Sequence, residues 1–166
     1  MKALKIEPGK APERIDIDNT LEALQNTVGG YIEAIYPDKH RPACLICNEE
    51  GKLSGLPMNR ALYAGDKPCD IICGTFLVVG ISEEDFTDLR EADAAYFEKM
   101  FHTPEKFGHF AGRLIISKVV SGGALFGSDG VKSKIPWQKL KSNKQKQAKQ
   151  PNAYFDKQNK QNKLLM

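Results

Sequence analysis

The sequence predicts an α+β fold with a small mixed or antiparallel sheet and two to three helices, followed by a disordered basic tail. Short segments with alternating apolar and polar residues recur through residues 1–126, as expected for half-buried strands. Two other segments carry apolar residues at helical spacing behind polar capping residues. From residue 127 onward, lysine, glutamine and asparagine dominate. Such a segment buries too little apolar surface to offset the entropy lost on ordering.

The N-terminal elements are predicted to be strand, strand, helix and strand. Apolar residues alternate with polar ones around Leu4 and again around Ile15, with a Pro/Gly loop between the two runs. Asn19, followed three residues later by a glutamate, has the spacing of a capping box and predicts a helix over residues 20–28. Residues 31–36 are rich in aromatic and β-branched side chains and end at a proline, which predicts the third strand.

The middle of the chain predicts a hairpin, one helical turn and a buried strand. Residues 42–47 are apolar and strand-like, and residues 48–51 form a polar turn after which the apolar pattern resumes. The proline that opens residues 57–62 predicts a single turn of helix. Residues 70–80 are the most hydrophobic stretch of the chain, and their β-branched content predicts a buried central strand.

The last predicted elements are a longer helix and one more strand. A capping residue at Ser82 precedes an apolar stripe that predicts a helix over residues 83–101, with a break near Arg90. Thr103, followed by a proline, has the pattern of another helix start. Residues 113–120 are strand-like and end at a Ser-Gly-Gly turn.

Charge is distributed unevenly between a predicted compact domain, residues 1–126, and a predicted tail, residues 127–166. Residues 132–166 contain ten lysines and one acid, a net charge of +9. Residues 1–131 contain 14 Lys and Arg against 20 Asp and Glu, a net charge of −6. This asymmetry is typical of a polyanion-binding protein, of a contact between tail and body, or of a solubilising appendage.

Hydrophobicity excludes several classes of protein. The mean hydropathy of −0.43 and the 41% hydrophobic residues are those of a globular chain, neither collagenous nor wholly disordered. No apolar run reaches the roughly 18 residues that a bilayer-spanning helix needs, and the N-terminus lacks the apolar stretch of a signal peptide. We therefore expect a cytoplasmic protein with no membrane partner.

Four cysteines raise the question of a zinc site. Cys44 and Cys47, with Cys69 and Cys73, supply the four thiols that a structural zinc needs. The strand pattern, however, sends Cys44 and Cys47 to opposite faces, because side chains alternate along a strand. We therefore expect four separate thiols and neither a metal nor a cofactor.

One group of polar residues is the candidate contact site for a ligand or partner. Asn48, Glu49 and Glu50 lie in the predicted turn, and Asn59 and Arg60 follow closely, so that two carboxylates and a guanidinium line one side of a predicted cleft. The alternative is an ordinary solvent-exposed turn in which Arg60 pairs with one of the glutamates.

The tail is the second candidate site. Its lysines are able to follow the phosphates of a nucleic acid while an aromatic residue stacks on bases, with little sequence preference. No arginine occurs in residues 132–166, which disfavours bidentate readout of bases. The candidate nucleic-acid contacts are Trp137, Lys139, Lys141, Lys144, Lys146 and Lys149.

Residues 1–101 resemble a known family. The resemblance rests on four segments in this order: the opening strand MKALKIEPG, the helix LEALQNTVGGYIE, the turn ICNEEGKLSGLPMNRAL and the strand IICGTFLVVG. These segments are similar to an uncharacterised domain family of small proteins from phages, plasmids and conjugative elements, mostly of Gram-positive bacteria. The resemblance implies a compact α+β domain encoded near accessory genes such as antirestriction genes, and it implies no established activity.

We therefore expect a non-enzymatic binding or adapter protein of a phage or other mobile element. Its expected partner is a host-encoded or element-encoded protein, or a small ligand, and interference with host defence is the expected outcome. The alternative is a nucleic-acid-associated factor in which the basic tail binds DNA or RNA.

Overall fold

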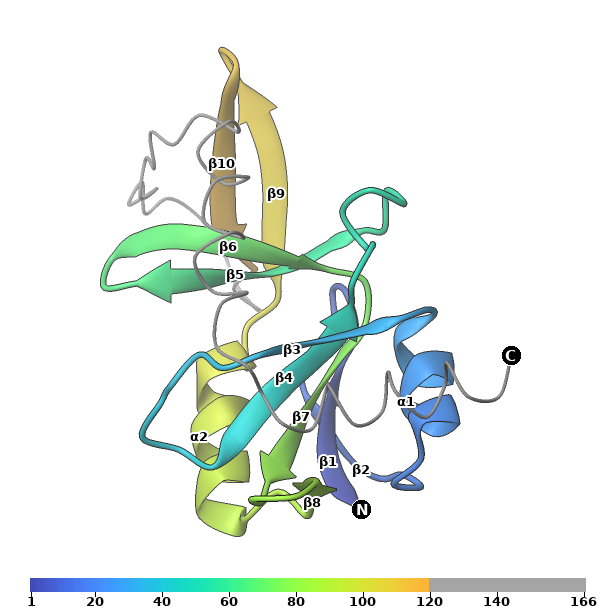
Figure 1. Cartoon of the computed structure of the whole chain (residues 1–166). Helices are drawn as coiled ribbons and strands as arrows, with labels where there is room; N and C mark the ends of the chain where they lie inside the picture. Colours follow the sequence, from blue (N-terminus) through green and yellow to red (C-terminus); the bar gives the residue numbers. More distant parts are fainter. Residues whose placement is uncertain (120–166) are drawn as a thin grey trace.

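The computed structural model describes residues 1–119 and is built around one antiparallel sheet (Figure 1). The strands of this sheet run in the order β2-β1-β7-β4-β3, and the short strand β8 pairs with β7. The central sheet comprises β1 (Lys2–Ile6), β2 (Glu13–Asp16), β3 (Ile32–Ile35), β4 (Ala43–Asn48), β7 (Phe76–Ile81) and β8 (Phe86–Thr87). The two helices are α1 (Leu21–Val28) and α2 (Glu91–Phe101). The predicted α+β fold, with a mixed or antiparallel sheet and two to three helices, is confirmed for residues 1–119, where the sheets are antiparallel and the helices are two.

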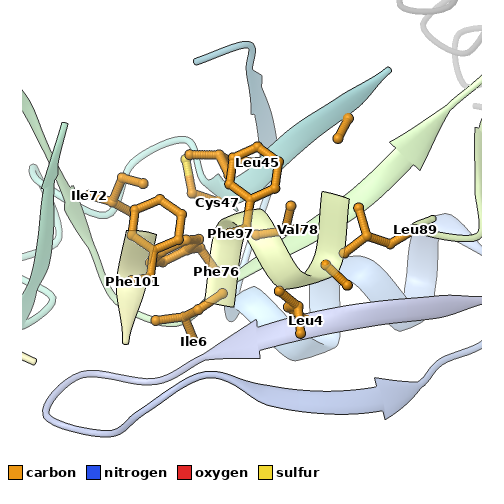
Figure 2. Packing of buried hydrophobic residues seen from close by; sticks show 12 residues of the cluster. Leu4, Ile6, Leu45, Cys47, Ile72, Phe76, Val78, Leu89, Phe97 and Phe101 are labelled. Atoms are coloured by element: carbon orange, nitrogen blue, oxygen red, sulfur yellow. The ribbon is translucent and has the colours of Figure 1, made fainter. Parts of the chain in front are cut away.

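The two helices cover opposite faces of the sheet. Alternation along β7 directs Val78 toward α2, where Phe97 lies, and Leu77 toward α1, where Leu24 lies. On the α2 side, aromatic rings fill the space between helix and sheet (Figure 2). The centroids of Phe76 and Phe101 are 5.2 Å apart in an edge-to-face arrangement. This two-sided burial explains why the central strands are almost wholly apolar.

The predicted first helix is confirmed, but its cap differs from the predicted one. Thr20 is the N-cap, and its hydroxyl accepts a hydrogen bond from the amide of Ala23 at 3.2 Å. Asn19 instead donates its side-chain amide to the carbonyl of Phe86 at 3.0 Å, which ties the start of α1 to β8. Gly29 ends the helix with φ of 78°, a conformation that favours glycine.

Three predictions for the middle of the chain are wrong. Residues 57–62 are not a helical turn: they enter strand β5 (Met58–Ala64), which pairs with β6 (Lys67–Cys73). Residues 70–80 are not one strand, because Gly74, with φ of 79°, turns the chain between β6 and β7. β4 likewise pairs with β3 and β7 and forms no hairpin across residues 48–51.

Two further predictions fail near the C-terminal end of the described residues. The helix begins at Glu91 and not at residue 83, because Ser82 closes a local turn with Asp85 and the chain then extends into β8. The N-cap of α2 is Arg90, where the sequence pattern predicted a break. Thr103 precedes no helix: the chain enters β9 (Glu105–Phe110), which pairs with β10 (Arg113–Lys118).

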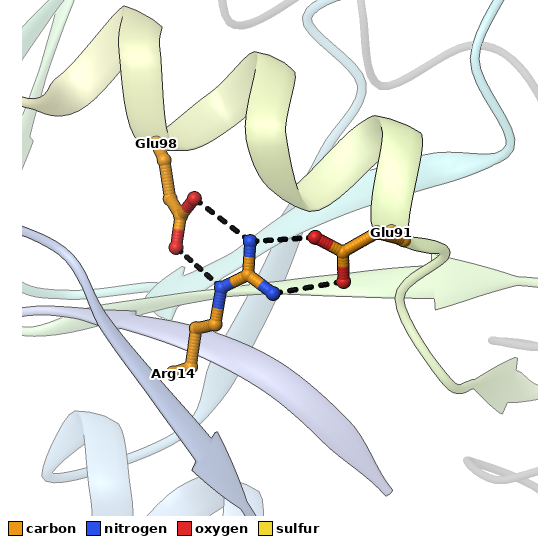
Figure 3. Close-up of polar contacts among 3 residues, drawn as sticks. All are labelled: Arg14, Glu91 and Glu98. Carbon is orange, nitrogen blue, oxygen red and sulfur yellow. Dashed lines mark hydrogen bonds and ion pairs between the residues drawn. The ribbon is translucent and has the colours of Figure 1, made fainter.

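A surface arginine fastens α2 to strand β2. Figure 3 shows the guanidinium of Arg14 between Glu91 and Glu98, which lie two turns apart on the helix. Its Nε lies 2.6 Å from Glu98, and its two terminal nitrogens each lie 2.8 Å from Glu91. These contacts raise the pKa of Arg14 and lower the pKa of both glutamates. All three side chains are solvent-accessible, and exposed ion pairs contribute little to the free energy of folding. The cluster therefore serves mainly to set the position of α2 relative to β2.

Within residues 1–119, neither helix has the length and apolar character needed to cross a membrane. The predicted domain boundary near residue 126 and the predicted disordered tail both lie outside the described residues.

Candidate functional site

Asn48 links the end of β4 to helix α1. Its side-chain amide donates to the carbonyl of Gly29 at 2.9 Å, and its carbonyl oxygen accepts from the amide of Glu50 at 2.9 Å. A Cβ on Gly30 would lie 2.7 Å from the Asn48 amide nitrogen, so the close approach requires glycine at position 30. Asn48 thus fixes the turn, and Glu49 and Glu50 are exposed on it.

Asn59 and Arg60 lie in the interior of the protein. The amide of Asn59 donates to the carbonyls of Ile6 at 2.9 Å and Gly74 at 2.7 Å, which joins β5 to the central sheet. The Arg60 guanidinium donates to the carbonyls of Phe101 at 2.9 Å and Lys10 at 2.6 Å. It also donates to the Asn59 side chain at 2.8 Å. These bonds leave Arg60 only 2% exposed, and burial lowers its pKa.

The five predicted contact residues therefore do not form one cleft. Asn48, Glu49 and Glu50 lie on an outer turn, whereas the side chains of Asn59 and Arg60 bond inward to main-chain carbonyls. The alternative, an ion pair of Arg60 with a turn glutamate, does not form either. Among the ion pairs of residues 1–119 none contains Arg60, and the carboxylate whose charge acts on its pKa is that of Glu105. A buried guanidinium is stable here because carbonyl oxygens replace its water.

A shallow hollow lies where the turn meets strand β6, and it contains two of the predicted residues. Its interior is about 20 Å³, which is room for about one water molecule or the tip of one side chain. Its polar lining residues are exposed or half-buried and therefore form its rim, whereas most of its apolar ones are buried. The rim carries three carboxylates and one ammonium, from Glu33, Glu49, Asp70 and Lys52, with Asn48 beside them. Its apolar lining comprises Ile35, Cys47, Ile71, Ile72 and Cys73. We call this feature the rim hollow.

The rim hollow has a negative rim over a neutral floor. Lys52 forms an ion pair with Asp70, whose carboxylate also accepts from the amide of Ile71 at 2.7 Å. Burial raises the pKa of the Cys73 thiol, and Lys52 opposes this only in part, so the thiol stays protonated at neutral pH. Glu33, Lys52, Asp70 and Cys73 were not predicted as site residues, because only the folded chain brings β3, the turn and β6 together.

The comparisons with known proteins identify the domain but assign it no activity. Residues 1–102 match the family described as a domain of unknown function, DUF3846. The chain belongs to the DUF3846 family. The match covers β1 through α2 and stops before β9, so the β9–β10 hairpin lies beyond the DUF3846 region. No curated protein and no solved structure gives a significant match.

Cys44 and Cys47 lie on opposite faces of the central sheet, as the strand pattern predicted. Cys44 packs on the α1 face of the sheet and Cys47 on the α2 face. Burial raises the pKa of Cys44 to about 12. Among residues 1–119, no three His, Cys, Asp or Glu side chains are grouped closely enough to hold a metal ion.

The DUF3846 domain also buries one carboxylate, and this makes its stability depend on pH. Asp93 is fully buried and accepts from Arg90 at 2.7 Å and from Arg41 at 2.8 Å. The hydrogen bond from Arg90, with that from Arg41, lowers the pKa of Asp93 below its ordinary value of 3.8, although burial opposes them. The stability that Asp93 contributes is therefore present above about pH 4 and lost as pH falls through the lower pKa of the folded state.

We expect Asp93→Asn to be less stable than the native protein at pH 7, with a gap that narrows as pH falls below 4. Chemical unfolding at a series of pH values from 7 to 2.5 measures this gap. The exposed Glu84 supplies a control, since Glu84→Gln is expected to shift stability by less than about 0.5 kcal/mol throughout. A gap of constant size down to pH 2.5 would show that the pKa of Asp93 is the same in the folded and unfolded states, which would contradict the lowered pKa.

Proposed function

We propose that the protein is a non-enzymatic binding protein whose rim hollow receives a lysine or arginine side chain of a partner protein. The observation that carries the proposal is the pairing of a negative rim with an apolar floor. A long basic side chain needs both, because its methylene stem packs on apolar surface while its charged head bonds to carboxylates.

The size of the hollow favours a side chain over a free cofactor. Small-molecule sites usually enclose about 300–1,000 Å³, which is far larger than the interior of about 20 Å³ here. One side-chain tip fits that volume, and the rest of a partner would lie on the surrounding surface. Three carboxylates against one ammonium also favour a cationic group over an anionic one.

The two buried carboxylates of the described region both have structural partners. Asp93 is bonded to two arginines, and Glu105 holds the amide of Ala61 at 2.7 Å. These observations support a binding role over a catalytic one. The resemblance to proteins of mobile elements supports a partner encoded by the host or by the element, with interference in host defence as the expected consequence.

The test uses the ¹⁵N-labelled full-length chain and two small probes, the blocked amino acids N-acetyl-lysine amide and N-acetyl-arginine amide. Blocked norleucine, which has the apolar stem without the charge, is the probe control. We expect amide chemical shifts to change around Glu33, Asn48 and Ile72 with the charged probes only. Changes spread evenly over all acidic surfaces would contradict the proposal.

Two neighbouring glutamates provide a matched pair of variants. Glu49 lines the rim hollow, whereas Glu50 is exposed on the same turn and does not line it. We expect Glu49→Gln to weaken binding of the basic probes several-fold and Glu50→Gln to change it less than twofold. Equal effects of the two variants would show that general negative charge attracts the probe.

A further inference from the structure

The β9–β10 hairpin projects from the rest of the fold and lies outside the DUF3846 region (Figure 1). Its inner face packs on the β5–β6 ribbon through Phe107, Leu114 and Ile116. The Glu105 carboxylate fastens its base, because it accepts from the amide of Ala61 at 2.7 Å and from the Tyr63 hydroxyl at 3.2 Å. Among residues 1–119, the contacts that hold the hairpin thus come from the β5–β6 side.

A tight turn at the tip sets the positions of the outer side chains. Ala111 and Gly112 have φ of 50° and 71°, the two positive values of a type I′ turn. Phe110 and Arg113 are cross-strand partners next to this turn, so their side chains lie on the same face. A non-glycine residue with positive φ is strained, which indicates that the packing below holds the tip in this form.

The outer face of the hairpin is aromatic, apolar and basic. Phe110 is 72% exposed and Ile115 40% exposed. Side chains alternate between the two faces of a strand, and Phe107 and Leu114 point inward to the β5–β6 ribbon. Their neighbours Lys106 and Arg113 therefore point outward, on the same face as Phe110. Neither cation appears among the ion pairs of the described residues.

Charge separates the hairpin from the domain that carries it. Residues 1–104 contain 11 Lys and Arg against 18 Asp and Glu. Residues 105–118 contain three cations and one carboxylate, Glu105, which is buried and already bonded. The sequence then continues toward residues 132–166, with ten lysines and one acid. A basic face on an acidic domain fits a polyanion.

We propose that the outer face of the β9–β10 hairpin binds single-stranded nucleic acid, with a base stacked on Phe110 and phosphates on Lys106 and Arg113. The exposed ring favours a nucleic acid over an acidic protein, because every base offers a face for stacking while carboxylates do not. Unpaired bases are free to stack on the ring, whereas those of a duplex are already stacked on each other. This site is separate from the rim hollow, and it goes beyond the proposed function.

The experiment measures binding of a fluorescent 20-nucleotide oligothymidylate to the full-length chain by anisotropy. We expect Phe110→Ala to weaken binding about tenfold and Phe110→Trp to retain it. We expect Lys106→Ala combined with Arg113→Ala to reduce the slope of log Kd against log salt concentration by about 1.4, since two phosphate contacts are lost. A duplex of the same length is expected to bind more weakly at matched salt.

Matched controls separate the hairpin from general aromatic exposure and general charge. Tyr31 is 71% exposed on another part of the domain, so its removal tests whether any exposed aromatic ring contributes to binding. Removal of the exposed Lys39 tests the same for any surface cation. Tyr31→Ala and Lys39→Ala are expected to leave both the affinity and the salt slope unchanged. Circular dichroism checks that each variant stays folded.

Three outcomes would overturn the proposal. The first is unchanged affinity in Phe110→Ala, which would assign any binding to residues beyond the hairpin. The second is equal competition by polyglutamate, which would indicate an acidic protein as the occupant. The third is a dimer in analytical ultracentrifugation that Phe110→Ala converts to a monomer, because a second copy of the chain would then cover this face.

Discussion

Arg60→Ala is expected to reduce the free energy of unfolding by about 3–5 kcal/mol. The variant leaves the carbonyls of Phe101 and Lys10 without their donors and opens a cavity beneath β5. Each buried acceptor left without a donor costs about 1–3 kcal/mol. A domain of this size has only about 5–15 kcal/mol of stability, so the loss is a large part of the total. Urea unfolding followed by circular dichroism measures it.

Two further variants separate the causes. Arg60→Met retains much of the side-chain volume but donates no hydrogen bond, so it isolates the cost of the orphaned carbonyls. Arg113→Ala removes an exposed arginine and is expected to change stability by less than about 0.5 kcal/mol. A loss below about 1 kcal/mol in Arg60→Ala would mean that water enters and replaces the guanidinium.

The burial of Arg60 also shows which parts of the fold were beyond prediction from sequence. An arginine next to an asparagine, after a proline, has the polarity of a surface turn. The strand there contains register shifts between Met58 and Arg60 and between Leu62 and Tyr63. These bulges break the two-residue alternation by which strands are recognised. A local pattern therefore predicted a helical turn where tertiary contacts form a strand.

Elements whose burial follows the local pattern were predicted correctly. β1 and β2 were predicted because their larger apolar residues, Leu4, Ile6 and Ile15, alternate with polar ones, and α1 carries its own capping residues. β9 was missed, because it begins with Glu105, a buried carboxylate that contacts β5 more than 40 residues earlier in the chain. No nearby residue signals such a contact.

The residues of the candidate site also fall into those that a local pattern predicted and those that only the fold brings together. Asn48 and Glu49 were predicted from a turn pattern, and they do line the rim hollow. Glu33 and Asp70 lie on other strands and are separated from that turn by 15 or more residues in sequence. Their convergence depends on β3 pairing with β4 and on the position of β6, which no single segment specifies.

Phe97→Ala is the other variant with a large expected effect, about 3–5 kcal/mol of lost stability. Phe97 is fully buried beside Phe101 (Figure 2). The centroid of its ring lies 6.1 Å from that of Phe101 and 5.1 Å from that of Tyr96. Its removal leaves a cavity between α2 and the sheet. Chemical unfolding gives the loss, and hydrogen exchange is expected to show faster exchange in α2 than in β4.

Met100 provides the control on the same helix. Its side chain is 42% exposed, so Met100→Ala is expected to cost less than about 0.5 kcal/mol. Phe97→Leu keeps most of the buried volume and is expected to cost about 1–2 kcal/mol, which keeps the prediction testable if Phe97→Ala fails to fold. Equal losses for Phe97→Ala and Met100→Ala would contradict the packing described.

Arg60 and Phe97 are expected to be coupled, because both hold the C-terminal half of α2. Arg60 bonds to the carbonyl of Phe101, and Phe97 lies one turn earlier against the ring of the same residue. If Phe97→Ala loosens this turn, the Arg60 hydrogen bonds are already weakened, so Arg60→Met then costs less. A double-mutant cycle is expected to give a coupling energy of at least about 0.5 kcal/mol, and additivity within about 0.3 kcal/mol would show that the two anchors act independently.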